Sequence, residues 1–193
     1  MARAKPVDML DVRKIPWQKK RDYLTLVAAV AASDGALHPD ELALLERWMG
    51  QFSLAEKSRQ VVLAAAKQES LSLEAIKRRL AKTDLVYSLM LDMLGMAMAD
   101  GVLMDEEILL LNDVAASLRL DPMDFGILIE FVHSAHQASL LNNPEPLYEH
   151  NIDCAFQLLH QKKVRLFPHT LLCVSSPDYD RHLKERWSSF QLN

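Results

Sequence analysis

Glycine and cysteine are scarce in this sequence. The first shortage bears on the fold class, and the second on the redox environment of the protein. Of 193 residues, only five are glycine and two are cysteine. Few glycines, together with many Leu, Ala, Met, Glu and Lys residues, favour helices over sheets. Cys154 and Cys173 lie far apart and form no C-x-x-C pair, which fits two free thiols in a reducing compartment. With 50% apolar residues, the chain can bury a core without disulfides or a structural metal.

The sequence also lacks a strong positive charge and a long apolar run. The formal net charge is −4, which argues against a general nucleic-acid-binding surface. The chain starts without the apolar segment of a signal peptide. The run at residues 23–32 is too short to span a bilayer, and Asp92 interrupts the longer run around residues 85–99. We therefore expect a soluble cytoplasmic protein without a transmembrane segment, whose contact with a membrane, if any, is peripheral to the inner face.

Basic residues are concentrated at the start of the chain. Residues 1–22 contain seven Lys or Arg residues and three Asp residues. Such a segment can meet anionic lipid or an acidic partner. A solvated basic tail is the simpler interpretation, and we favour it for residues 1–16, because a short basic stretch matches no specific motif.

The motifs of common enzyme classes are missing as well. The sequence has no Gly-rich phosphate loop, no G-x-S-x-G and no H-E-x-x-H. His133 and His136 share a predicted helix at i, i+3 spacing, which could suit a metal. Because the sequence offers no third ligand beside them, we interpret both as exposed polar positions. These absences favour a protein that is not an enzyme.

Apolar residues recur at helical spacing along most of the chain, which predicts a compact, all-α helical bundle. Gly35 and Gly101 are expected to end helices, Pro39 to begin one, and Ser53 with Glu56 to form a capping box for another. The predicted helices cover about residues 17–33, 39–52, 56–68, 72–82, 84–99, 105–118, 122–139 and 146–162, with a short one closing the chain after an extended stretch.

One acidic turn occurs twice. Residues 33–41 read SDGALHPDE, and residues 99–107, 66 positions later, read ADGVLMDEE. Each turn lies between the expected end of one helix and the expected start of the next. The order helix, turn, helix, capped helix is repeated too, so we predict an internal duplication with units of about 17–82 and 84–140. Two units are too few for a solenoid, and we expect them to share one core across a pseudo-twofold axis.

Four carboxylates of these turns are candidate metal ligands. Asp34 and Asp100 extend the apolar stripes of the helices before the turns. Glu41 and Glu107 begin the stripes of the helices after them, so each carboxylate is expected to point towards the buried side. An aspartate at the C-terminal end of a helix is disfavoured by the macrodipole, and four inward carboxylates would repel one another. A divalent cation would relieve this repulsion; Ca, Mg, Mn and Zn are not distinguished.

Asp40, Glu106 and His38 are candidate secondary ligands. Asp40 and Glu106 lie about 100° around their helices from the inward residues and are expected to face solvent. The alternative is that both turns are structural, since Asp-Gly is a common turn pair. Glu41 and Glu107 would then satisfy donors at the N-terminus of their helices. His38 is a poor cap by residue type, which weakens this alternative slightly.

The duplicated motif DG-x-L-x-x-[DE]-E resembles the tellurite-resistance TerB family. A similar turn occurs in the TerB-like region of membrane-anchored DjlA co-chaperones. The resemblance covers about residues 17–140 and leaves residues 141–193 as a C-terminal extension, helical and then irregular. It implies a role in tellurite-type stress responses, in protein assemblies near the inner face of the membrane. It also implies a helical bundle with an internal duplication and a metal ion bound by the matching residues Asp34, Glu41, Asp100 and Glu107.

Three functions are therefore open from the sequence. We favour a non-enzymatic metal-binding scaffold protein with protein partners. The second is a protein-interaction or co-chaperone-like module, in which the carboxylates cap helices and contact a basic partner. A metal-dependent hydrolase is the least favoured, because no general base or substrate pocket can be named.

Overall fold

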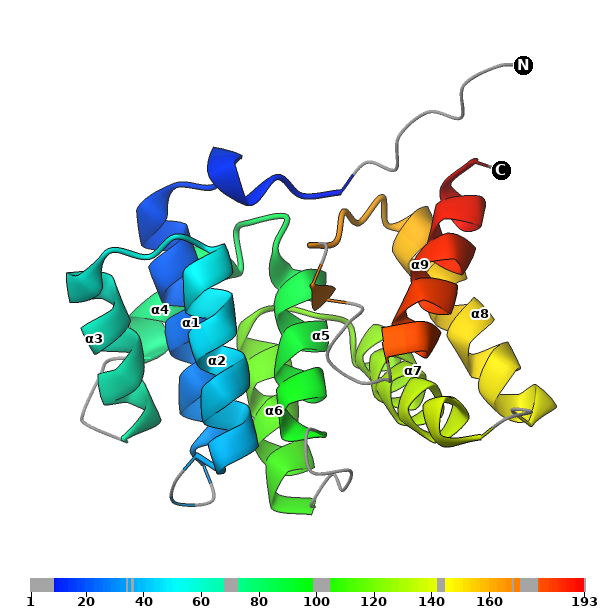
Figure 1. Cartoon of the computed structure of the whole chain (residues 1–193), viewed down its shortest axis with the longest axis horizontal. Coiled ribbons are helices and arrows are strands. Elements are labelled where there is room, and N and C mark those ends of the chain that lie inside the picture. Colours follow the sequence, from blue (N-terminus) through cyan, green and yellow to red (C-terminus); the bar gives the residue numbers. More distant parts are fainter. Residues whose placement is uncertain are drawn as a thin grey trace.

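The computed structural model is a bundle of helices (Figure 1). It describes residues 9–33, 35, 37–67, 73–98, 105–141, 145–167, 169–170 and 177–192. These residues contain no strand, and the predicted all-α fold is confirmed. The elements in chain order are η1 (Val12–Lys14), α1 (Trp17–Ala31), α2 (Pro39–Gln51), α3 (Glu56–Ala66), α4 (Leu73–Leu80), α5 (Val86–Ala97), α6 (Asp105–Ser117), α7 (Pro122–Leu140), α8 (Pro146–Gln161) and α9 (Pro177–Leu192).

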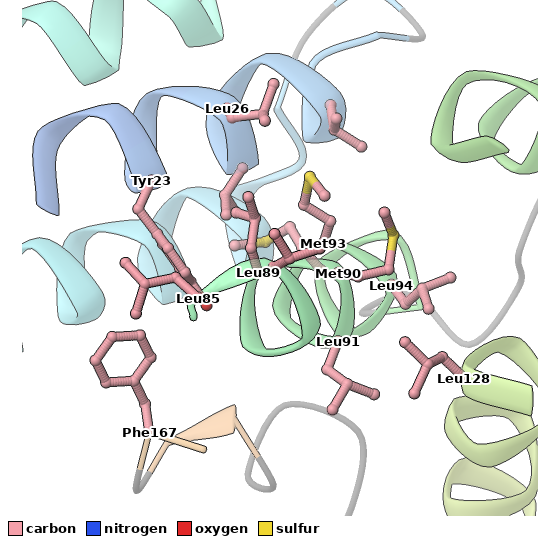
Figure 2. Packing of buried hydrophobic residues seen from close by; sticks show 14 of the residues in the cluster. Tyr23, Leu26, Leu85, Leu89, Met90, Leu91, Met93, Leu94, Leu128 and Phe167 are labelled. Carbon is pink, nitrogen blue, oxygen red and sulfur yellow. The ribbon is translucent and has the colours of Figure 1, made fainter. Parts of the chain in front are cut away.

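Helices α1 and α5 form the centre of the bundle. α1 packs against α2, α3, α4 and α5, while α5 also packs against α6 and α7. Every residue of α5 except Tyr87 is buried, as expected of a helix that is apolar on all sides. Figure 2 shows Leu94 of α5 beside Leu128 of α7. The longer apolar run, which Asp92 interrupts, therefore lies at the centre of the fold. Among the described residues, no helix is long and apolar enough to cross a membrane.

The helix bounds follow the 66-residue spacing of the sequence repeat. A helix of the first predicted unit begins or ends 66 positions before its counterpart in the second. The predicted pseudo-twofold relation between the two units stays a prediction. The matching bounds are the starts of α2 and α6 at Pro39 and Asp105, the starts of α3 and α7 at Glu56 and Pro122, and the ends of α1 and α5 at Ala31 and Ala97.

Ser53 does not open α3, so the predicted capping box with Glu56 is wrong. The φ of Ser53 is 51°, in the left-handed region. The backbone N–H of Leu54 donates to the carbonyl of Met49 at 3.1 Å, which is the Schellman pattern of a helix C-terminus. Ser53 therefore ends α2, and the N-cap of α3 is Ala55, which makes no side-chain cap.

The C-terminal extension belongs to the same core. α8 packs against α7, and α9 packs against α8. Between α8 and α9, Leu166 and Phe167 are fully buried. The backbone N–H of Leu10 donates to the carbonyl of Leu166 at 2.9 Å, and Leu10 is itself buried. The prediction of a solvated tail is therefore wrong at Leu10, because its apolar side chain gains more from packing on the core than from staying in water.

Candidate functional site: two acidic turns and a buried polar cluster

The two predicted metal-binding turns connect α1 to α2 and α5 to α6. Asp34 and Asp100 lie outside the described residues. The helix ends that flank the two turns lie at the same end of the bundle, the lower end in Figure 1. Since α1 packs against α5, this arrangement is compatible with one site built from both turns. The shared site itself stays a prediction.

Glu41 is half-buried and takes part in a capping box at the start of α2. Its Oε2 accepts a hydrogen bond of 2.7 Å from the backbone N–H of His38. In turn, Nδ1 of His38 accepts a longer bond of 3.4 Å from the backbone N–H of Asp40. His38 therefore does cap the helix, although its residue type indicated a poor cap. This bond gives Glu41 the structural role that the alternative interpretation expects.

Glu107 is half-buried as well, at the equivalent position of α6. A carboxylate has two oxygens that can accept several bonds, so a capping role does not exclude a cation ligand. Carboxylate oxygens are also the donors that hard divalent cations prefer. The chemistry of Glu41 and Glu107 thus fits a metal ion.

The candidate secondary ligands are less enclosed. Asp40 and His38 are exposed, and Nδ1 of His38 lies 3.6 Å from a carboxylate oxygen of Asp40. The side chain of Glu106 lies outside the described residues. Within the part of the chain that the structure describes, no three His, Cys, Asp or Glu side chains are grouped to hold a metal. A complete site would therefore need carboxylates outside the described residues, such as Asp34, Asp100 or Glu106.

The structure also contains a buried polar cluster that the sequence did not predict. Asp92 of α5 is 0% exposed. The hydroxyl of Tyr23 in α1 donates to its Oδ2 at 2.6 Å, and Nε2 of His169 lies 2.8 Å from the same oxygen. The other oxygen, Oδ1, has no hydrogen-bond partner among the residues that the structure describes. Burial removes the hydration of a carboxylate, which costs free energy. The contacts with Tyr23 and His169 offset part of this cost for Asp92.

Aromatic rings enclose His169, which is 4% exposed. Its ring stacks on Phe167 with centroids 5.2 Å apart, and the rings of Trp48 and Phe52 lie 5.2 and 5.3 Å away. Tyr23 meets Phe167 edge to face at 5.5 Å, and both side chains are visible together in Figure 2. Such aromatic pairs contribute about 0.5–1.5 kcal/mol each beyond their burial. The cluster therefore joins α1, α2, α5 and the segment after α8 and is too enclosed to meet a substrate.

One sequence signal could have pointed to part of this cluster. Asp92 interrupts an otherwise apolar run, and charged residues are almost never fully buried without a partner. A buried partner for Asp92 could thus have been expected. Nothing local marks His169 as that partner, since it lies 77 positions further along the chain.

A second polar network joins α5, α7 and the end of α8. Oδ2 of Asp124 accepts a hydrogen bond from the hydroxyl of Tyr87 at 2.6 Å and lies 2.8 Å from Nζ of Lys162. Burial, and then the neighbouring Asp124 carboxylate, raise the pKa of Tyr87 above its usual value near 10. The same carboxylate raises the pKa of Lys162.

Alkaline pH is expected to destabilise the fold through Tyr87. The pKa of its hydroxyl is higher in the folded chain than in the unfolded chain. The stabilisation that the protonated Tyr87 hydroxyl gives the folded chain is therefore complete below about pH 10. It is lost as pH rises through the folded-state pKa. Urea unfolding at several pH values from about 8 to 11 should show a fall in the free energy of unfolding that is smaller in Tyr87→Phe. The same pH slope in both proteins would contradict this prediction.

The chain matches the family model described as "Tellurite resistance protein TerB" over residues 24–128. Comparison with curated proteins and with solved structures gave no match. The matched range runs from α1 into α7 and contains both acidic turns and Asp92, whereas α8, His169 and α9 lie beyond it. It covers more than half of the chain and confirms the resemblance that the repeated motif indicated. The chain belongs to the tellurite-resistance TerB family.

Proposed function

We propose that this TerB-family chain is a non-enzymatic, metal-binding scaffold protein whose two acidic turns hold one divalent cation. The supporting observation is the equivalence of the turns. The helix ends around them lie at one end of the bundle (Figure 1), and Glu41 and Glu107 are half-buried at equivalent positions. Calcium takes six to eight oxygen ligands, more than the Asp and Glu of one turn can provide. A site that combines Asp34 and Glu41 with Asp100 and Glu107 has four carboxylates instead of two.

A cation bound by both turns would hold the two turns at a fixed distance from each other. It would offset the repulsion among the carboxylates and fix the α1–α2 connection relative to the α5–α6 connection. The end of the bundle would then present a defined surface to a protein partner. A cytoplasmic location and a role in a tellurite-type stress response, with partners near the inner face of the membrane, are part of this proposal through family membership.

Metal binding is expected to be saturable near one ion per chain. Calorimetric titration of chelator-stripped protein with Ca²⁺, Mg²⁺, Mn²⁺ and Zn²⁺ would measure it and name the ion. Asp34→Asn/Asp100→Asn should weaken binding by on the order of 100-fold, because even the loss of outer-shell partners typically costs 10- to 100-fold. A control with the same change in net charge is Glu46→Gln/Glu185→Gln, at exposed positions of α2 and α9, and it should bind like the unchanged protein.

A protein-interaction or co-chaperone-like module is the second candidate function. The capping box of His38 and Glu41 favours it, because that box explains the acidic residue without a metal. The same titration separates the two functions. No heat with any of the four ions, in protein that circular dichroism shows to be folded, would contradict the metal proposal and leave the acidic turns as structure or partner surface.

A further inference from the structure

A pocket of about 250 Å³ opens where three chain turns meet. Its walls come from the connection between α4 and α5, the connection between α6 and α7, and the end of α8. Apolar side chains and polar groups both line it, including Leu118, Leu120, Val164 and the network residue Tyr87. It lies outside both acidic turns and outside the buried cluster around Asp92.

The pocket is positively charged, although the chain as a whole is negative. Arg119, Lys162 and Lys163 line it together with a single carboxylate, Asp84. Asp84 is already paired with Arg165 at 2.8 Å, and Lys162 with Asp124 at 2.8 Å. Arg119 and Lys163 have no ion-pair partner among the residues that the structure describes. Two positive charges are thus left uncompensated at one pocket in a chain of net charge −4.

The backbone conformation of these two cations is unusual. Arg119 and Lys163 have φ of 61° and 54°, in the left-handed region. Each follows a helix with a Schellman end: Leu120 N–H donates to the carbonyl of Ala115 at 3.0 Å, and Val164 N–H donates to that of Leu159 at 2.9 Å. Glycine is the preferred residue at such a position, because a side chain is strained there. Strain of this kind, retained with a charged side chain, points to a function for that side chain.

The helix dipole offers a competing explanation, since cations are stabilising at helix C-termini. The first repeat unit provides an internal comparison. Ser53 occupies the equivalent left-handed position after α2, 66 positions before Arg119, and is itself neutral. The cation at that helix end comes from α1, because Nζ of Lys20 donates to the carbonyl of Phe52 at 3.2 Å. The dipole can therefore be met without a cation at the left-handed position itself, and it does not account for two such residues lining one pocket with apolar walls.

We propose that this pocket binds a small organic molecule that carries one dianionic group, such as a phosphate monoester. The two uncompensated charges of Arg119 and Lys163 match the charge of a dianion. The guanidinium of Arg119 can hold phosphate in a bidentate manner. Leu118, Leu120 and Val164 provide apolar surface for the organic part, and Lys162, held by Asp124, lines the pocket beside them.

Titration of the full chain with phenyl phosphate, followed by NMR, tests this proposal. We expect saturable shifts for pocket residues with a dissociation constant on the order of 1 mM, a typical value for weak small-molecule binding. Inorganic phosphate should bind more weakly, because it lacks the organic part. Phenol, which lacks the charge, should not bind.

Arg119→Gly/Lys163→Gly separates ligand binding from helix termination. The variant should bind phenyl phosphate at least about tenfold more weakly, because both uncompensated charges are gone. Its Tm should stay level or rise by about 2–4 °C, because glycine relieves the left-handed strain. The matched control is Ser53→Gly, which relieves the same strain away from the pocket and should bind phenyl phosphate normally. Arg119→Asn/Lys163→Asn is a second variant, since asparagine also tolerates this conformation.

Two results would overturn the proposal. One is the absence of phenyl phosphate binding by the unchanged chain. The other is equal binding by the unchanged chain and both double variants. If either result came with a lowered Tm of the glycine variant, the role of Arg119 and Lys163 would be to stabilise the C-termini of their helices and not to bind a ligand.

Discussion

Replacing His169 with alanine is expected to lower the free energy of unfolding by about 3–5 kcal/mol. The substitution leaves Asp92 buried without one of its two partners, and removing one member of a buried pair typically has an effect of this size. It also removes the ring that packs against Phe167, Trp48 and Phe52. Since small proteins are stable by about 5–15 kcal/mol in total, this loss is a large share of the stability.

Urea unfolding of His169→Ala measures the effect, with His133→Ala as the control because His133 is exposed on α7. The control should change the free energy of unfolding by no more than about 0.5 kcal/mol. A double-mutant cycle with Asp92→Ala should give a coupling energy of about 1–3 kcal/mol. Coupling near zero would show that His169 stabilises the fold by ring packing alone.

Replacing Phe167 with alanine is expected to lower the free energy of unfolding by about 3–5 kcal/mol as well. The ring is fully buried and contacts Tyr23, Phe52 and His169, with centroid distances of 5.1–5.5 Å. Its removal leaves a cavity at the point where the segment after α8 meets α1 and α2. Figure 2 shows Phe167 entering from a different chain segment than the helices around it.

Thermal and urea unfolding of Phe167→Ala test this prediction. A suitable control from the same C-terminal extension is Leu147→Ala, since Leu147 of α8 is 60% exposed and its loss should cost at most about 0.5 kcal/mol. Similar small losses for both variants would mean that the segment around Phe167 is dispensable. Phe167 and His169 are in contact, so their effects are not expected to add.

These two predictions concern residues beyond the range that matches the TerB family. The match ends at residue 128, while Phe167 and His169 lie in the extension. Both side chains nevertheless complete the core around Tyr23 and Asp92. In this chain, the extension therefore contributes buried side chains to the core of the family fold.

Local sequence patterns were sufficient to predict α1 to α8. The expectation of only a short helix at the end of an irregular extension is wrong, because α9 spans Pro177–Leu192. The Asp121-Pro122 pair predicted the start of α7, and the Asp121 side chain does accept a hydrogen bond from the backbone N–H of Met123 at 2.8 Å. The same kind of reasoning failed at Ser53, whose spacing to Glu56 fits a capping box. There the closing turn of α2, with the bond from Leu54 to Met49, determines the conformation. The spacing of Ser53 and Glu56 is compatible with the start of α3, but Ser53 stands at the end of α2. The sequence motif alone does not distinguish these two positions.

Contacts between distant segments could not be predicted from the sequence. The bond from Leu10 to Leu166 and the contact between Asp92 and His169 both join residues with no shared local pattern.

The candidate metal site was predicted only in part. Glu41 was expected to point inward and is half-buried, yet its hydrogen bond to His38 shows a capping role that was only the alternative.

The most direct test of a cation shared by both turns is the number of ions bound by the single variants Asp34→Asn and Asp100→Asn. Calorimetry under identical conditions should give one ion per chain for the unchanged protein. Because one site would use both turns, either substitution alone should weaken that binding by about tenfold or more, with no strong site left over. Two ions per chain, with one retained at full affinity in each variant, would contradict the shared site.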